Sequence, residues 1–152
     1  MKISTKGRYA VRILLDLAEN QKDGYISLKS VAERQDISKG YLEQIISVLR
    51  NSVVVSANRG FQGGYRLAGA ASEYSVGDIL RLTEGAMAVV ACLEKGVGGC
   101  ARQPFCLTRP VWVGLTKAIA DYLDSITLQN ILDANRLPGG SSVRSGFKRK
   151  GC

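Results

Sequence analysis

The chain has 152 residues, a formal net charge of +8, and 45% hydrophobic against 22% charged residues, which is typical of one compact domain. It contains no histidine, which excludes histidine-based acid–base catalysis and metal sites that need an imidazole ligand. No apolar run approaches the roughly 18 residues of a membrane-spanning helix, and the first residues contain no apolar signal region. We therefore expect a cytoplasmic protein without a membrane partner.

The positive charge is concentrated in the first half of the chain. Residues 1–68 contain 11 Lys and Arg against 6 Asp and Glu, whereas residues 69–135 contain 5 against 7. Residues 136–152 add 5 basic residues and no acidic residue. Because an uneven basic charge favours binding to a polyanion, the first half is the predicted nucleic-acid-binding part. A generally basic, solvated surface is the alternative that charge alone leaves open.

A helix-turn-helix pattern is predicted within the first 50 residues. Apolar residues at helical spacing predict a core helix over residues 5–20. Ser27 can cap a short helix, and after a turn Ser38 can cap a second one, about Lys39–Arg50. The second helix of such a pair enters the major groove of DNA, and an ordinary helical hairpin is the alternative. The residues expected to face DNA from this helix are Lys39, Tyr41, Glu43, Gln44, Ser47 and Arg50.

A hairpin is predicted directly after this helix. The β-branched run Val53–Val55, the glycine-rich stretch 58–64 and Tyr65–Leu67 predict two short strands and a long tip. A hairpin at this place is a wing. Arg59 at its tip is expected to enter a narrow minor groove, and Gly60 lets the backbone approach phosphates closely. A nucleotide-binding loop is the alternative, but the lysine and the long helix that such a loop needs are missing.

A short helix and a cysteine-containing loop come next. Ser75 and Asp78 have the spacing of a capping box and open a helix that ends near Glu84. Clustered thiols in a cytosolic protein indicate a metal site or redox thiols. The residues alone leave zinc, redox thiols and an iron-sulfur cluster equally open. The clustered cysteines are Cys92, Cys100 and Cys106.

A second long helix is predicted after the loop. Thr108 can cap it, and Pro110 fits its first turn because no amide hydrogen is needed there. An apolar stripe at alternating intervals of 3 and 4 residues has the spacing of a coiled coil and predicts a dimer interface, with packing inside one chain as the alternative. Thr127 can cap a last short helix. The stripe consists of Trp112, Leu115, Ile119, Tyr122 and Ile126.

These elements predict a mainly α-helical fold with a small β-hairpin wing, a winged helix-turn-helix followed by a long dimerisation helix. The expected parts are a DNA-binding domain, a cluster-binding cysteine loop, a dimerisation helix with a short last helix, and a basic disordered tail. They occupy residues 1–84, 85–107, 108–134 and 135–152. The expected partners are double-stranded DNA and a second copy of the chain. No Cys-x-x-Cys pair is present, which argues against a thiol redox enzyme.

Several separate motifs link the chain to a known family. They are residues 1–10, Gly40–Gln44, Arg59–Gly60, Gly63–Tyr65 and Asp124–Leu128. In this order and spacing they closely resemble the IscR-type family of bacterial winged-helix regulators, over about residues 1–134. The resemblance implies a homodimer with two winged helix-turn-helix units and a long crossed dimerisation helix. It also implies a transcription regulator, such as a repressor, in iron-sulfur cluster assembly, nitric oxide stress or cysteine metabolism.

The resemblance further implies an iron-sulfur cofactor. Several family members bind a 2Fe-2S or 4Fe-4S cluster through three cysteines in the corresponding loop, and Cys92, Cys100 and Cys106 match them. We therefore expect these residues to ligate a cluster, of the 2Fe-2S type. The alternative function is an apo-active repressor of cysteine metabolism, or a zinc- or thiol-based regulator without a cluster.

The chain departs from the family at the fourth ligand. Some relatives have a histidine three residues after the last cysteine, where this chain has Arg109, and others use an aspartate from the partner's first helix, where it has Arg8. Arginine stays protonated at neutral pH and is not an ordinary ligand. The gap of seven residues between the first two clustered cysteines is also longer than in the best-known members. Glu94, a backbone group, an exogenous thiol, water and Cys152 are the candidates, and an exchangeable cluster is the resulting hypothesis.

Overall fold

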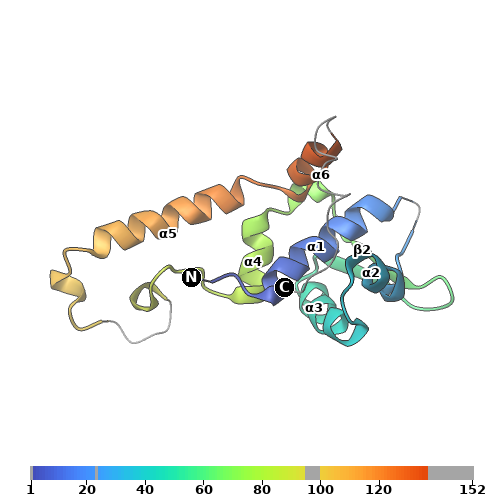
Figure 1. Ribbon diagram of the computed structural model, residues 1–152, viewed down its shortest axis with the longest axis horizontal. Coiled ribbons are helices and arrows are strands. Elements are labelled where there is room, and N and C mark those ends of the chain that lie inside the picture. Colours follow the sequence, from blue (N-terminus) through green and yellow to red (C-terminus); the bar gives the residue numbers. More distant parts are fainter. Residues whose placement is uncertain (1, 23, 95–99, 137–152) are drawn as a thin grey trace.

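The computed structural model describes residues 2–22, 24–94 and 100–136 (Figure 1). Helices α1 to α4, the hairpin and α6 form one body, from which the long helix α5 extends. This arrangement confirms the predicted mainly helical fold with a small wing. The helices are α1 (Thr5–Asn20), α2 (Leu28–Gln35), α3 (Lys39–Asn51), α4 (Val76–Glu84), α5 (Arg109–Asp124) and α6 (Leu128–Arg136). The strands are β1 (Val55–Asn58) and β2 (Gly64–Leu67), and short 3-10 turns are η1 (Ala71–Glu73), η2 (Ala91–Leu93) and η3 (Gln103–Phe105).

The core is built around α1. The apolar stripe expected over residues 5–20 is buried, and α2, α3 and α6 pack against it. Serine caps open the first three helices, because each hydroxyl accepts a hydrogen bond from a backbone amide three residues later. The predicted caps at Ser27 and Ser38 are therefore confirmed, and Ser4 has the same role in α1. No helix among the described residues has the length and apolar character needed to cross a membrane.

The wing begins two residues later than the sequence predicts. β1 starts at Val55, whereas Val53 has a φ of 59° in the left-handed region. The amide of Val53 donates to the Arg50 carbonyl at 3.0 Å, and that of Val54 donates to the Leu49 carbonyl at 3.1 Å. This pair of bonds is a Schellman motif, which ends a helix and is usually built with glycine at the left-handed position. The prediction of a strand at Val53 was wrong because these residues terminate α3 first.

Val53→Gly is expected to raise the free energy of unfolding by about 1 kcal/mol, because glycine adopts the left-handed region without the strain of a β-carbon. The midpoint of denaturant unfolding, at an unchanged m value, measures this gain. Val53→Ala is the matched variant. Since alanine keeps the β-carbon, its gain should be clearly smaller, and a glycine variant no more stable than the parent chain would refute the strain argument.

The hairpin is fixed by its own register and by a contact with the segment before α2. β1 and β2 pair antiparallel from Val55 opposite Leu67 to Asn58 opposite Gly64. Ile26, two residues before α2, adds an isolated bridge to Tyr65 with two backbone hydrogen bonds of 2.8 Å. The wing is therefore attached to the helix-turn-helix unit on both sides.

The chain returns to the same body after α5. Ser75 and Asp78 form the predicted capping box of α4. The amide of Val76 donates to the Ile126 carbonyl at 2.8 Å, and the amide of Leu128 donates to the Tyr74 carbonyl at 3.0 Å. Leu128 at the start of α6 is fully buried in the core around α1. The two ends of this segment are thus tied to each other beside α1.

Helix α5 differs from the prediction at both ends. The Thr108 hydroxyl accepts no bond from the first turn of the helix, so the predicted cap is wrong. It instead lies 3.4 Å from the Cys106 sulfur. Pro110 occupies the first turn, as predicted. The helix ends at Asp124, so Ile126 of the predicted stripe lies beyond it, because the chain there becomes extended to pair with α4. The predicted Thr127 cap of α6 is confirmed by its bonds with Asn130.

Candidate DNA-binding surface and cysteine loop

The outer face of α3 presents most of the residues expected to face DNA. Glu43, Gln44 and Arg50 are exposed, together with Ser47. Lys39 is exposed too, and its ammonium lies 3.7 Å from the Glu43 carboxylate. This exposed ion pair is weak, so both side chains remain available to another partner.

Tyr41 lies differently from these neighbours. Its side chain is half-buried, and its ring packs edge-on against that of Tyr9 on α1, with centroids 5.9 Å apart. The guanidinium of Arg12 lies over the Tyr9 ring, 5.1 Å from its centroid. The contact between Tyr41 and Tyr9 helps to hold the first turn of α3 on α1.

The wing carries a second exposed surface. Arg59 and Gly60 are both exposed at its tip, and Gly60 has a φ of 114°, which favours glycine. Arg66 on β2 lies over the Tyr25 ring, 4.9 Å from its centroid. Residues 54–69 contain no Asp or Glu. The wing therefore presents only positive charge, as a phosphate-binding element requires.

A polar groove of about 720 Å³ opens between the wing and α2. It was not predicted, because it depends on the attachment of the hairpin to the segment before α2. Its lining is neutral or basic and combines backbone from the wing tip with side chains of α2. The residues that matter most for charge and hydrogen bonding are Ser27, Ser30, Arg34, Asn58, Gln62 and Arg66.

A buried carboxylate holds α2 against α1. Asp16 is only 3% exposed and accepts hydrogen bonds from Arg34 at 2.6 and 2.9 Å and from Gln35 at 2.8 Å. Arg12 in turn donates to the Gln35 carbonyl at 2.6 Å. The sequence signal was an acidic residue on the apolar face of the first helix, but its partners come from a different helix. This network sets the position of α2, and through it that of α3.

The cysteine loop lies between α4 and α5. Cys92 and Cys100 are exposed, Cys106 is half-buried, and all three are free thiols. In the described part of the chain, no group of three or more Cys, Asp or Glu side chains is close enough to hold a metal ion. The structure therefore does not bring the three predicted ligands together. Residues 95–99 and Cys152 lie outside the described residues.

The Cys106 thiol has the environment of a reactive cysteine. Its pKa is lowered chiefly by the Thr108 hydroxyl at 3.4 Å, with help from the backbone amides of Thr108 and Arg109 and the charge of Arg102, while desolvation opposes these effects. A lowered pKa increases the thiolate fraction at neutral pH, and thiolate is both the nucleophile and the metal ligand.

Thr108→Val is expected to slow the alkylation of Cys106 by iodoacetamide at neutral pH, because removal of the hydroxyl raises the thiol pKa. The pH profile of the rate should shift to higher pH, with the rate at high pH retained. Peptide mass spectrometry separates the rate at Cys106 from that at Cys92, which is the internal control. Identical pH profiles for the two proteins would exclude the role of Thr108.

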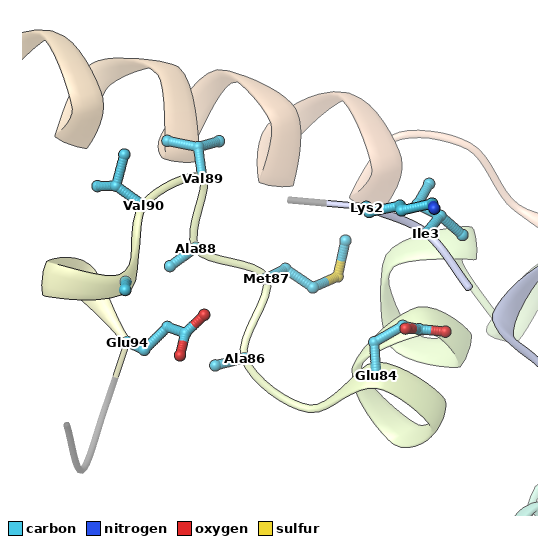
Figure 2. Close-up of a pocket in the computed structure, with 10 residues that line it drawn as sticks. Lys2, Ile3, Glu84, Ala86, Met87, Ala88, Val89, Val90 and Glu94 are labelled. Carbon is cyan, nitrogen blue, oxygen red and sulfur yellow. The ribbon is translucent and has the colours of Figure 1, made fainter.

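The start of the loop packs along α5. Figure 2 shows Val89 and Val90 directed toward this helix, and the Val89 amide donates to the Thr116 hydroxyl at 3.4 Å. Below them a cavity of about 280 Å³ lies between the loop and the first residues of the chain. Glu84, at the end of α4, lines this cavity and accepts a 2.5 Å bond from the Ser4 hydroxyl. The loop is therefore in contact with α5 and with the α1–α4 junction.

The other end of α5 is joined to α4 by charge. Arg81 contacts both carboxylate oxygens of Asp124 and lies 3.2 Å from Asp78. All three side chains are partly exposed, so the network fixes geometry more than it adds stability. Helix α5 is thus connected to α4 at its carboxyl end, and its middle is bonded to the cysteine loop.

Comparison with known proteins identifies the family. The family model Rrf2, described as an iron-dependent transcriptional regulator, matches residues 3–134. The chain belongs to the Rrf2 family. It is 39% identical to the transcriptional regulator IscR of Klebsiella pneumoniae over 141 residues, covering 89% of this chain and 85% of that protein. It is 40% identical to the transcriptional regulator CymR of Bacillus subtilis over 131 residues, covering 86% and 89%.

Solved Rrf2 structures give the same result. CymR, the global cysteine regulator of B. subtilis, superposes with a TM-score of 0.73 at 38% identity and covers 88% of this chain and 97% of that one. T. potens IscR superposes with a TM-score of 0.70 at 38% identity and covers 99% and 94%. The chain is therefore a DNA-binding transcription regulator and not an enzyme, and the predicted resemblance is confirmed. Relatives named IscR and relatives named CymR match equally well, so the comparison does not identify the signal to which this regulator responds.

Proposed function

We propose that this Rrf2 regulator is a cytoplasmic homodimer that senses iron-sulfur or redox status through a cysteine-ligated cluster and controls genes of iron-sulfur assembly or sulfur metabolism as a repressor. The observation that carries this proposal is the position of three free thiols, two of them exposed, on the loop between the DNA-binding body and α5. A chemical change at this loop acts where the two parts of the protein meet.

The donor set fits an iron-sulfur cluster of the 2Fe-2S type. Cys92, Cys100 and Cys106 would hold it, since three soft thiolates suit iron-sulfur chemistry and nothing in the described structure engages them in a disulfide. A bound cluster would supply a redox-responsive and oxygen-sensitive group. The similarity to the IscR-type family favours it over zinc. Glu94 is exposed at the end of η2 and is the carboxylate nearest in sequence to Cys92.

Helix α5 has the properties of a dimer interface. None of its residues is fully buried in the described chain. In the apolar stripe, Leu115 and Tyr122 are 44% and 66% exposed, and Trp112 and Ile119 are half-buried. An apolar helix that projects from the body gains stability when a second copy covers it (Figure 1). Ile126 lies past the helix end and would contribute only at the edge of this contact.

Three contacts connect the cysteine loop to the DNA-binding body and support an influence of the loop on DNA binding. Val89 ties the loop to α5, Asp124 ties α5 to α4, and Glu84 ties α4 to α1. Since a dimer reads two half-sites separated by about 34 Å per helical turn, a small rotation of α5 changes the spacing of its two α3 helices. The affinity for the operator then depends on the state of the loop.

The first experiment is anaerobic purification followed by a visible spectrum and iron and sulfide analysis. We expect charge-transfer absorbance with stoichiometric iron and sulfide, and its loss in Cys106→Ser. DNA binding of the apo and holo forms is then compared at one salt concentration. Equal affinities would reject the sensor mechanism. Retention of the cluster in Cys152→Ser would leave Glu94, a backbone group or a non-protein group as the fourth ligand.

A second candidate is a regulator of cysteine metabolism that binds DNA in its apo form. The 40% identity to CymR supports it. This regulator would be colourless and free of iron even after reconstitution, and a zinc-containing variant of it would retain zinc without visible absorbance. The same spectrum and metal analysis therefore separate the two candidates.

Arg59→Ala is expected to weaken DNA binding by about 10- to 100-fold, because a wing arginine contacts the minor groove in this proposal. Gln44, Glu43 and Tyr41 are the proposed base readers, and the exposed Lys39 and Arg50 the phosphate contacts. Fluorescence anisotropy over a salt series measures both affinity and slope, which changes by about 0.9 for each phosphate contact.

Lys117→Ala is the matched control for Arg59→Ala, because it removes one positive charge on α5, far in sequence from α3 and the wing. Its DNA affinity should equal that of the parent protein. If the two variants bind DNA equally well, the wing takes no part in recognition.

A further inference from the structure

The wing tip carries an exposed aromatic side chain that has no role in the proposed function. Phe61 is fully exposed, with a relative accessibility of 107%, the highest among the large hydrophobic side chains of the described residues. It is the first central residue of a tight turn in which the Gly63 amide donates to the Gly60 carbonyl at 2.9 Å. This turn is the tip of the hairpin, and the hairpin loop extends beyond α2 (Figure 1).

The backbone around Phe61 is constrained. A β-carbon on Gly63 would lie 2.6 Å from the Asn58 carbonyl oxygen and 2.8 Å from that of Gly60, so the two sides of the turn are in close contact. The hairpin is anchored near the tip end of its strands, where Tyr65 of β2 bridges to Ile26. A ring held by such a turn loses little backbone entropy on binding, which is a property of a preorganised contact.

The residues around the Phe61 ring favour binding to a polyanion whose grooves contain apolar surface. Arg59 is two residues away, Arg66 lies on β2, and the whole segment 54–69 is free of acidic residues. β1 also packs against α3, so the position of the wing tip is coupled to that of the recognition helix. Basic charge beside a single apolar ring matches the minor groove of DNA, where sugar and base edges lie between two phosphate chains.

We propose that Phe61 is an apolar wedge that enters the minor groove of bound DNA and partly unstacks a flexible pyrimidine–purine step. Arg59 and Arg66 neutralise the flanking phosphates, and the wedge adds a preference for deformable steps that no hydrogen bond reads. This inference rests on the proposed binding of DNA through α3 and the wing.

The test begins with a duplex selected from a random-sequence pool by the full-length protein. Hydroxyl-radical footprinting locates the minor groove covered by the wing, and 2-aminopurine is placed at pyrimidine–purine steps there. Binding of the parent protein should raise the 2-aminopurine emission through unstacking. Phe61→Ala should abolish this rise and weaken binding by about 10-fold or more, given the usual gain from burying a phenylalanine. Phe61→Leu should retain most of both effects.

Lys117→Ala is again the control, since it changes an exposed side chain on α5, outside α3 and the wing, and should leave emission and affinity unchanged. Thermal unfolding verifies that all three variants fold. If Phe61→Ala binds and unstacks DNA like the parent protein, the wedge is rejected, although DNA recognition by α3 and the wing stands. If the parent protein enriches no sequence from the pool, the proposed function and the wedge fail together.

Discussion

Gly64→Ala is expected to detach the wing and to lower the free energy of unfolding by about 3 kcal/mol. A β-carbon at this position would lie 2.4 Å from the Ile26 carbonyl oxygen and 2.6 Å from its carbon. Both of these are backbone atoms, which cannot rotate away as a side chain would. To relieve the overlap, β2 must move and the two 2.8 Å bonds between Ile26 and Tyr65 must break. Each bond contributes about 1 kcal/mol, and the packing of the hairpin adds the remainder.

Denaturant unfolding measures the stability of Gly64→Ala, and DNA anisotropy measures its function. Gly114→Ala is the matched control, because no heavy atom lies within 4 Å of its new β-carbon. Since Gly114 is inside α5, alanine should there stabilise the helix by up to about 1 kcal/mol. A Gly64→Ala protein with the stability and DNA affinity of the parent would show that the wing is not fixed through Ile26.

Asp16→Ala is expected to lower the free energy of unfolding by about 3 kcal/mol. The carboxylate is buried, whereas the Arg34 side chain is 38% exposed. In the variant, the unpaired guanidinium therefore recovers part of its hydration. The loss of stability then falls at the lower end of the range for broken buried ion pairs. Gln35 also loses its partner. Because α2 is then held less firmly on α1, the affinity for DNA should fall with the stability. Asp16→Asn keeps one acceptor oxygen, so its free energy of unfolding should lie between those of the parent protein and Asp16→Ala.

Asp121→Ala tests whether this effect comes from burial rather than from charge. Asp121 contacts Lys117 at 2.5 Å on α5, and both side chains are more than 60% exposed. Its removal should cost less than about 0.5 kcal/mol, as for other exposed pairs within a helix. Equal losses for the two aspartate variants would show that the network around Asp16 does not position α2.

The local signals in the sequence predicted the elements well where the chemistry is local. Ser27, Ser38 and Ser75 each precede a helix and bond to an amide three residues on, so neighbouring residues determine the cap. Helical spacing predicted the buried face of α1 for the same reason. The errors occurred where two local preferences compete. Val53 has high strand propensity, but the end of α3 requires a left-handed residue there, and the helix termination prevailed.

Features that depend on distant residues could not be predicted. Asp16 is visible as an acid on an apolar face, but its partner Arg34 follows only from the packing of α2 on α1. Ile126 continues the spacing of α5, yet its carbonyl bonds to Val76 in a segment 50 residues earlier. The cysteine spacing indicated sulfur ligands without saying whether the loop brings them together, because loop conformation does not follow from periodicity. The exposed face of α3 was predictable, whereas the inward packing of Tyr41 depends on Tyr9.

The burial of Leu128 in the core around α1 has a consequence for synthesis of the protein. A nascent chain that has emerged from the ribosome only as far as the wing and α4 lacks this side chain, and its apolar core is still open. By the time α6 emerges and closes the core, α5 has already been made. In the proposed dimer, we therefore expect each newly made subunit to become competent for DNA only when it is also competent to pair, so that half-assembled regulators do not occupy operators.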